Sequence, residues 1–198
     1  MKILGAVIAG GKSSRMGGRE KSFLVLDGAS LLDRTLSRLR FQVDDLIINA
    51  NGDATRFATS GATVVEDVLT DIGTPLAGLH AALCYGANHG FAAVVTVPSD
   101  APFLPLDLVE RLVDAGEVSG AAIARSDEQD HYLTGIWTTS MAKSLGRLIE
   151  TDGLRRVQDF VMKAKAEKVV WAAIPHDPFF NINTPEDLEM AEMIARGA

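Results

Sequence analysis

Short apolar runs alternate along the first part of the chain with segments whose apolar residues recur at helical spacing. A continuous apolar run is typical of a strand that is covered on both faces, and such runs predict strands at Ile3–Ala9, Leu46–Ile48, Thr63–Val65 and Ala92–Val97. Helices are predicted between them, at Leu31–Leu39, Thr55–Ser60, Gly78–Ala87 and, beginning at Pro105, Leu106–Val113. This alternation predicts an α/β fold with a single doubly wound, mostly parallel sheet and helices on both faces.

The second part of the chain has a less regular pattern. Strands are predicted at Ala121–Ala124 and Leu133–Trp137, around the polar segment Arg125–Asp130, and at Val169–Ile174. Helices are predicted near Met141–Glu150, at Leu154–Ala164, and after Thr184, which is followed by Pro185 at the first helical position. No internal repeat, low-complexity tract or linker interrupts residues 1–198, so we expect one domain.

The composition narrows the function classes. The formal net charge is −7, which argues against a general nucleic-acid binder, because such a protein needs a broad basic face. Cys84 is the only cysteine, so no disulfide within the chain is expected. The run at Ile3–Ala9 leads into glycines instead of a cleavage site, and no stretch approaches the roughly 18 apolar residues of a membrane helix. We therefore expect a soluble cytoplasmic protein without a membrane partner.

Polar residues that could bind a ligand or take part in a reaction follow each of the first four predicted strands. They are the segment 10–21, then Asn49, Asp67 and Asp100. In doubly wound folds, ligands bind beyond the carboxyl ends of the strands, so these positions are expected to form one site.

The segment 10–21 is rich in glycine and contains four basic residues and one acidic residue. Glycines allow backbone amides to approach phosphate oxygens, and Lys and Arg neutralise them, so the segment is suited to a polyphosphate. It is not a P-loop, because Ala6 stands where that motif needs its first glycine, and it lacks the Gly-x-Gly-x-x-Gly dinucleotide fingerprint.

Several blocks of this sequence together resemble the MobA-like nucleotidyltransferase family, and in particular its molybdenum cofactor guanylyltransferase branch. The blocks occur in the family's order: Ile8-Ala9-Gly10-Gly11, Arg15-Met16-Gly17-Gly18, Lys21, Asn49-Ala50-Asn51, Glu66-Asp67, Pro75-Leu76-Ala77-Gly78, Pro98-Ser99-Asp100-Ala101-Pro102 and Asn181-Ile182-Asn183-Thr184-Pro185-Glu186. The resemblance implies a Rossmann-like nucleotidyltransferase fold, with a nucleotide-binding half at 1–116 and an acceptor-side half at 117–198. The implied activity is the transfer of GMP from GTP to the phosphate of molybdenum-molybdopterin, with release of pyrophosphate.

The same resemblance assigns roles to individual residues. It implies that Lys21 and Arg15 contact phosphate and that Asp100 binds both Mg²⁺ and nucleotide, so these three are the predicted catalytic residues. The predicted nucleotide-binding set is Ile8, Ala9, Gly10, Gly11, Lys21, Asn49, Asp67, Gly78 and Asp100. Asn181 and Asn183 are predicted to lie on the acceptor side, where one of them supports the metal or the acceptor phosphate.

The residue types are compatible with these roles, although each also has a purely structural alternative. Asp100 follows a buried strand between Pro98 and Pro102 and offers the hard oxygen that Mg²⁺ prefers, but an aspartate there can also cap a helix. Asp67 can accept from guanine N–H groups or ribose hydroxyls, and Asn49 can both donate and accept, but both residue types are also common in turns.

Two positions depart from the family pattern. The family has His-Pro where this chain has His131-Tyr132, and a lone histidine is more often structural than catalytic. Glu20 stands where the family commonly has Asp before its phosphate-binding lysine, which predicts a small change of geometry.

Two alternative functions and the oligomeric state stay open. A related transferase that uses CTP or another phosphorylated acceptor is the nearest alternative, and a noncatalytic GTP-binding module that delivers cofactor is another. Molybdoenzymes or their chaperones are further expected partners. The sequence leaves the choice between monomer and homo-oligomer undecided.

Overall fold

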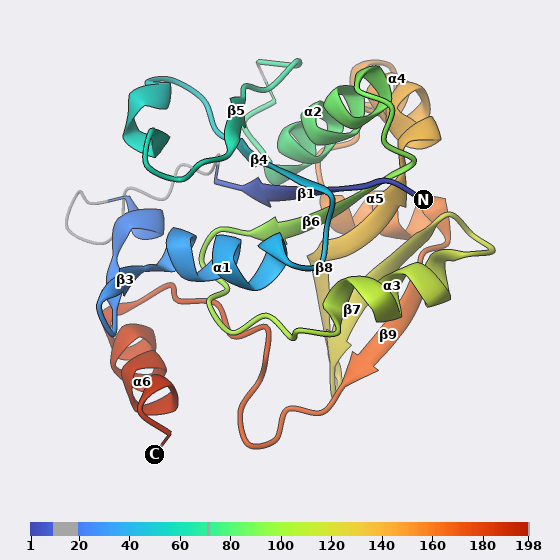
Figure 1. Ribbon diagram of the computed structural model, residues 1–198. Coiled ribbons are helices and arrows are strands. Elements are labelled where there is room, and N and C mark those ends of the chain that lie inside the picture. The colour runs from blue at the N-terminus through green and yellow to red at the C-terminus, as the bar shows by residue number, and fades with distance from the viewer. Residues whose placement is uncertain (10–19, 71, 198) are drawn as a thin grey trace.

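A computed structural model describes residues 1–9, 20–70 and 72–197 of the chain. Within these residues, seven strands form a sheet in the order β5-β4-β1-β6-β8-β7-β9 (Figure 1). The strands are β1 (Ile3–Ile8), β4 (Asp45–Asn49), β5 (Thr63–Val65), β6 (Ala93–Pro98), β7 (Ala121–Ser126), β8 (Gln129–Thr138) and β9 (Glu167–Trp171). Only β8 runs antiparallel to its neighbours, β6 and β7, so the predicted mostly parallel sheet is confirmed.

Helices cover both faces of this sheet, as expected for a doubly wound fold. The helices on its faces are α1 (Leu31–Arg40), α2 (Pro75–Asn88), α3 (Leu108–Gly116), α4 (Ala142–Glu150) and α5 (Val157–Ala164), whereas α6 (Pro185–Ala195) packs away from the sheet. One hydrophobic core lies between the sheet and α1 and α3, and a second lies between the sheet and α2, α4 and α5 (Figure 1). Side chains alternate between the two faces of each strand: in β1, Val7 belongs to the first core, whereas Ala6 and Ile8 belong to the second.

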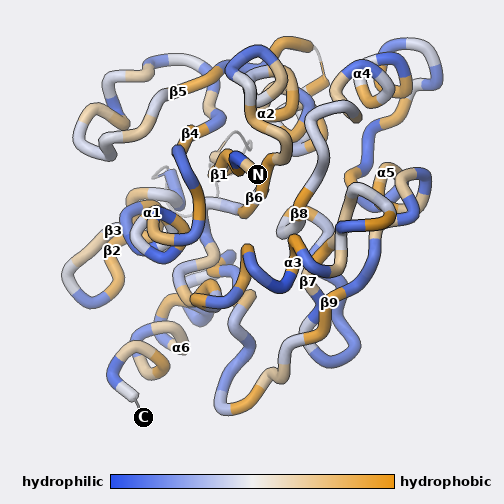
Figure 2. The backbone as a smooth tube through the Cα atoms, turned by 45° about the vertical axis from the view of Figure 1, so that its right-hand side comes forward, coloured by the Kyte–Doolittle hydropathy of each residue, from blue (hydrophilic) through white to orange (hydrophobic). Residues whose placement is uncertain are grey.

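The distribution of hydrophobic residues agrees with this layering. In Figure 2 the hydrophobic colour marks the central strands β1 and β6, whereas outer turns of α4 and α5 carry hydrophilic segments. None of the helices in the described ranges has the length and hydrophobicity needed to cross a membrane.

A third, smaller core lies apart from the sheet. It joins α6 to a hairpin of two short strands, β2 (Val25–Leu26) and β3 (Ala29–Ser30). The sequence analysis did not predict this hairpin, nor the 3₁₀ turn η1 (Lys21–Phe23) that precedes it. The N-terminus of α6 was predicted correctly, because Thr184 and Asp187 form a capping box and Pro185 is the first helical residue.

Several predicted boundaries were wrong. Helix α3 begins at Leu108 instead of near Pro105, and Oε1 of Gln42, which follows α1, accepts a hydrogen bond at 3.0 Å from the backbone N–H of Val109 in the first turn. The polar segment Arg125–Asp130 is mostly strand, since β7 and β8 turn directly into each other at residues 127–128. Strand β9 begins at Glu167 and ends at Trp171, so it lies earlier in the chain than the predicted strand Val169–Ile174. The short helix near Thr55 is a 3₁₀ turn, η2 (Ala54–Phe57).

Candidate functional site

The carboxyl ends of the first four sheet strands lie level with one another. Ile8 of β1 pairs with Asn49 of β4 on one side and with Pro98 of β6 on the other, and Asn49 pairs in turn with Val65 of β5. The backbone N–H of Ala9 donates to the carbonyl oxygen of Asn49 at 2.9 Å, which continues the alignment by one residue. The polar residues that follow these strands therefore meet at one edge of the sheet.

Asp67 is held at this edge by two asparagine side chains. Nδ2 of Asn49 donates to one carboxylate oxygen of Asp67 at 2.9 Å, and Nδ2 of Asn51 donates to the other at 2.8 Å. Oδ1 of Asn51 in turn accepts from the backbone N–H of Asp67 at 2.9 Å. Each carboxylate oxygen keeps a lone pair, so Asp67 is fixed in place and can still accept from a ligand.

Gly78 lies in the first turn of α2, directly against Asn49. A Cβ at position 78 would overlap with Oδ1 of Asn49 and would also lie 3.1 Å from Cγ2 of Ile8. Asn49 is 1% exposed, and its Oδ1 is buried without a hydrogen-bond partner among residues 1–9, 20–70 and 72–197. Glycine at position 78 thus lets the helix approach Asn49 closely, and so supports the geometry of Asp67.

Lys21 and Asp100 lie beside each other on the next part of this edge. The electrostatic effect of Lys21 on Asp100 lowers the pKa of that carboxyl, but burial is the larger influence and leaves the pKa raised. The two segments are joined by Ser22, whose Oγ lies 2.9 Å from Oγ of Ser99 in a buried contact. A partly desolvated carboxylate beside a cation is the arrangement expected where a charged ligand completes the site.

The segment that precedes α6 completes this edge. The backbone N–H of Ile182 donates to the carbonyl oxygen of Asp100 at 3.2 Å. Asn183 accepts a hydrogen bond at 2.7 Å on Oδ1 from Nζ of Lys21. Asn181 has a buried Oδ1 without a hydrogen-bond partner in the part of the chain that the structure describes. The structure therefore brings Asn183 into contact with Lys21, and Asn181 immediately precedes Ile182, whose backbone binds that of Asp100.

The donor set at this edge fits a magnesium ion. In the described ranges, no group of three or more His, Cys, Asp or Glu residues is arranged to hold a metal. Mg²⁺ does not need one, because it typically takes one or two carboxylates together with phosphate oxygens and water. The carboxylate of Asp100 and the unpartnered Oδ1 of Asn181 are both hard oxygen donors, and a polyphosphate would supply the remainder.

Sequence reasoning missed one residue that connects two parts of the site. Nη1 of Arg56 pairs with Oε2 of Glu20 at 2.6 Å, and Nη2 donates to the carbonyl oxygen of Asn51 at 2.8 Å. Arg56 therefore links the residue before Lys21 to the asparagine that holds Asp67. The only local signal was an arginine in a short polar segment, which is far too common to single out.

The remaining predicted residues are either peripheral or not described. Ile8 and Ala9 end the first strand at the site, whereas Gly10, Gly11 and Arg15 lie outside the described residues. His131 is 8% exposed and lies on β8, where burial lowers the pKa of its imidazole. The roles assigned to all these residues stay predictions.

Comparison with known sequences places this geometry in a family context. Residues 5–168 match the family model of the MobA-like NTP transferase domain. A protein of Bradyrhizobium sp. (strain ORS 278) named molybdenum cofactor guanylyltransferase is 41% identical over 197 residues, which cover 98% of this chain and 93% of that protein. A protein of the same name from Nitrobacter hamburgensis is 41% identical over 195 residues, covering 96% of this chain and 93% of its own length.

Solved structures share the same architecture. Molybdopterin-guanine dinucleotide biosynthesis protein A from Archaeoglobus fulgidus superimposes with a TM-score of 0.72 at 27% identity, covering 98% of this chain and all of that one. The 2-C-methyl-D-erythritol 4-phosphate cytidylyltransferase from Thermus thermophilus reaches a TM-score of 0.73 at 20% identity, covering 99% of this chain and 100% of that one. The second similarity concerns the fold alone.

Proposed function

The chain belongs to the family of MobA-like NTP transferases, and from this premise we propose that it transfers GMP from GTP to the terminal phosphate of molybdenum-bearing molybdopterin. The observation that carries this proposal is the identity of 41%, over nearly the whole chain, to proteins named molybdenum cofactor guanylyltransferase. The site supports it independently, because a cation, a carboxylate and unsatisfied oxygen donors lie together at the carboxyl edge of the sheet.

The reaction exchanges one phosphoanhydride bond for another. An oxygen of the acceptor phosphate forms a bond to the α-phosphorus of GTP, while the bond between the α-phosphorus and the oxygen that bridges to the β-phosphorus breaks. That bridging oxygen leaves with the electron pair as part of pyrophosphate. A phosphate monoester has its second pKa near 6, so the attacking group is already largely ionised at neutral pH and needs no strong base.

The residues of the chain supply charge and alignment. Among the described residues, Lys21 donates to Asn183 with one of its three N–H bonds, and the ammonium charge is suited to neutralise the triphosphate. Asp100 and Asn181 would hold Mg²⁺, which when bound neutralises phosphate charge and stabilises the departing pyrophosphate. Preorganised charge and alignment account for most of the acceleration in phosphoryl-transfer chemistry.

Nucleotide recognition is assigned to the Asn49–Asp67–Asn51 group. With both oxygens of its carboxylate positioned by the two amides, Asp67 can accept from the N–H groups of guanine or from ribose hydroxyls. A rigid acceptor discriminates more strongly than a mobile one, because a ligand without the matching donor removes water from the carboxylate and leaves its remaining lone pairs unsatisfied.

The direct test is pyrophosphate release with Mg²⁺ and molybdenum-loaded molybdopterin, with GTP and CTP offered separately. Release with GTP alone is expected. Release with CTP alone would overturn the choice of nucleotide. Binding of GTP without pyrophosphate release would overturn the catalytic proposal in favour of a nucleotide-binding module.

A further inference from the structure

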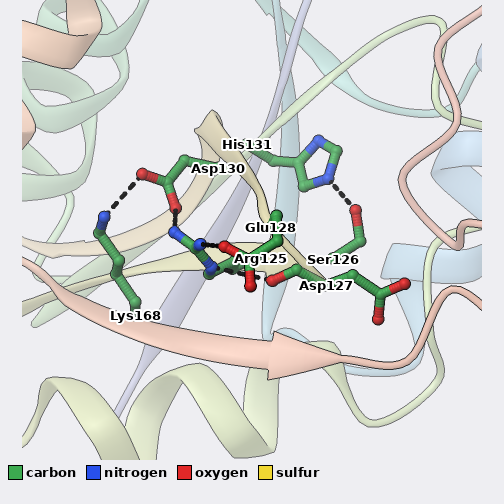
Figure 3. Close-up of polar contacts among 7 residues, drawn as sticks. All are labelled: Arg125, Ser126, Asp127, Glu128, Asp130, His131 and Lys168. Carbon is green, nitrogen blue, oxygen red and sulfur yellow. Dashed lines mark hydrogen bonds and ion pairs between the residues drawn. The ribbon is translucent and has the colours of Figure 1, made fainter.

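Ser126, His131 and Asp177 form a polar cluster at the carboxyl end of β7 that the proposed reaction does not use. Oγ of Ser126 lies 2.6 Å from Nε2 of His131 and donates to Oδ2 of Asp177 at 3.0 Å. Ser126 is 3% exposed and His131 is 8% exposed, so both are buried. Figure 3 shows the Ser126–His131 contact at one end of the β7–β8 hairpin.

The hydrogen bonds of this cluster determine which ring nitrogen carries the proton. An ionised carboxylate can only accept, so the single hydroxyl proton of Ser126 goes to Asp177. The oxygen of Ser126 must then accept from the ring, and Nε2 of His131 is the donor. In a neutral imidazole the other nitrogen, Nδ1, therefore carries a lone pair.

The ring is held in this neutral form. Burial lowers the pKa of His131, and the opposing charges of Asp177 and Asp130 do not reverse that direction. Asp130 is itself engaged elsewhere, because it accepts from Arg125 and from Lys168 at 2.7 Å each (Figure 3). The Arg125–Asp130–Lys168 network fixes the hairpin but leaves the imidazole uncharged.

Nδ1 points away from the residues that hold the ring. In Figure 3 it lies on the side of the ring opposite to Ser126. Among the hydrogen bonds of residues 1–9, 20–70 and 72–197, none satisfies Nδ1 of His131, and 6% of the side-chain surface stays exposed. A buried ring with one nitrogen engaged and the other without a partner among these residues is suited to accept a hydrogen bond from a ligand.

The cluster lies close to the acceptor side of the proposed site. The ring of Phe179 packs against that of His131, with centroids 4.8 Å apart. Asn181 follows Phe179 by two residues, which corresponds to at most about 7 Å of extended chain. Ile182 then binds the backbone of Asp100. Residues 177–183 thus connect the His131 cluster directly to the residues proposed to hold the metal.

We propose that Nδ1 of His131 accepts a hydrogen bond from an N–H or O–H group of the acceptor substrate, and that Asp177 and Ser126 are positioning residues that fix the required tautomer. This inference rests on the proposed function for the identity of the acceptor. It assigns His131 to acceptor recognition, whereas the lone histidine in the sequence favoured a structural role.

Two variants test the roles of Nε2 and Nδ1 of His131 separately. In His131→Gln, the amide nitrogen can replace Nε2 and keep the bond to Ser126, but no atom replaces Nδ1. In His131→Asn, an amide oxygen can occupy the Nδ1 position, while the bond to Ser126 is lost. Loss of one hydrogen bond predicts that His131→Gln raises the KM for molybdenum-loaded molybdopterin by about tenfold. Its KM for GTP and its Tm are expected to stay unchanged.

The paired variant gives the opposite pattern. His131→Asn is expected to lower Tm and to keep the acceptor KM closer to that of the wild-type protein. A purely structural histidine would reverse this result, with wild-type acceptor KM in His131→Gln and impaired function in His131→Asn, and that outcome would overturn the inference.

If His131→Gln does not fold, Ser126→Ala provides the test, since two equally populated tautomers would raise the acceptor KM by about twofold. An unchanged KM in folded Ser126→Ala would contradict the proposed relay.

Direct binding keeps this test separate from the test of the proposed function. The affinity of wild-type protein and of His131→Gln for molybdopterin can be measured by fluorescence titration without GTP. Wild-type protein that binds molybdopterin but releases no pyrophosphate would contradict the proposed reaction, and weaker binding by His131→Gln would still support the inference. Equal binding by the two proteins would overturn the inference alone, and wild-type protein that binds no molybdopterin would overturn both.

Discussion

Nζ of Lys21 donates to Oδ1 of Asn183 at 2.7 Å, although the two residues are 162 positions apart in the sequence. This bond connects the segment that follows β1 to the segment that precedes α6. It also orients the ammonium group beside Asp100, whose pKa Lys21 lowers against the larger effect of burial. Asn183 is itself anchored, because its backbone N–H donates to the carboxylate of Asp187 at 2.8 Å. The position of the proposed phosphate-binding lysine therefore depends on the C-terminal part of the chain.

Replacing this neutral acceptor by a charged one should weaken nucleotide binding. In Asn183→Asp, a carboxylate would pair with Lys21 and compete with the triphosphate, and we expect the KM for GTP to rise by about tenfold, as a charge-assisted bond is about twice as strong as a neutral one. Steady-state pyrophosphate release measures this effect. Asn88→Asp, an exposed site at the end of α2, is the matched control for net charge. Equal KM values for GTP in the two variants would show that Asn183 has no specific influence on nucleotide binding.

Asp100 should destabilise the ligand-free protein, although pyrophosphate release requires it. Burial raises the pKa of Asp100, so the ionised carboxylate costs folding free energy at neutral pH. Asp100→Asn is therefore expected to raise Tm by about 2–4 °C at pH 7 in the absence of metal and nucleotide, and to abolish most of the pyrophosphate release. Differential scanning calorimetry on the ligand-free variant, beside the activity assay, checks both parts.

The pH dependence of this stabilisation has a defined sign. A raised pKa means that the folded state binds a proton more readily than the unfolded state does. The gain in Asp100→Asn should thus be fully present above the folded pKa and should disappear as pH falls towards the ordinary aspartate value near 3.9. Asp114→Asn, on the exposed surface of α3, should show no such gain. A Tm difference for Asp100→Asn that grows on acidification would refute this account.

Gly78 should be required because of the space that Asn49 occupies. A Cβ at this position overlaps with Oδ1 of Asn49, so Gly78→Ala is expected to destabilise the protein by about 1–3 kcal/mol and to displace the amide from Asp67. Chemical denaturation measures the first effect, and calorimetric titration with GTP measures the second.

The double variant Gly78→Ala with Asn49→Ala separates these two effects. Removal of the Asn49 side chain relieves the overlap, so the double variant should be more stable than the sum of the single changes predicts. GTP binding should stay weak, because Asp67 has lost one of its two amide donors. Strict additivity in the free energy of unfolding would show that Asn49 is not the obstacle to a larger residue.

The sequence was sufficient to predict that the candidate residues meet at one edge of the sheet. Continuous apolar runs marked the central strands, and parallel strands align their carboxyl ends, so Asn49, Asp67 and Asp100 could be expected at one edge. The hairpin of β2 and β3 was also within reach. Its turn is Asp27-Gly28, with both residues at positive φ, and that dipeptide is a strong hairpin signal.

Contacts between distant side chains could not be predicted in this way. The first turn of α3 donates a hydrogen bond to Gln42, which is 67 positions away from Val109, so no local pattern could reveal this contact. The orientation of His131 likewise depends on Asp177, which reaches it through Ser126 from beyond the last strand. Such contacts follow from tertiary packing, and local propensity carries no information about them.

Arg56 offers a test of a contact that the sequence did not reveal. Its ion pair with Glu20 is partly exposed, so Arg56→Ala should change the free energy of unfolding by no more than about 1 kcal/mol. It should nevertheless raise the KM for GTP by about threefold, because the loss of a hydrogen bond to the carbonyl oxygen of Asn51 loosens the support of Asp67. Arg196→Ala, which breaks an exposed pair with Glu192, should leave the KM for GTP unchanged. If the two variants have the same KM, Arg56 stabilises the surface alone and does not position the nucleotide site.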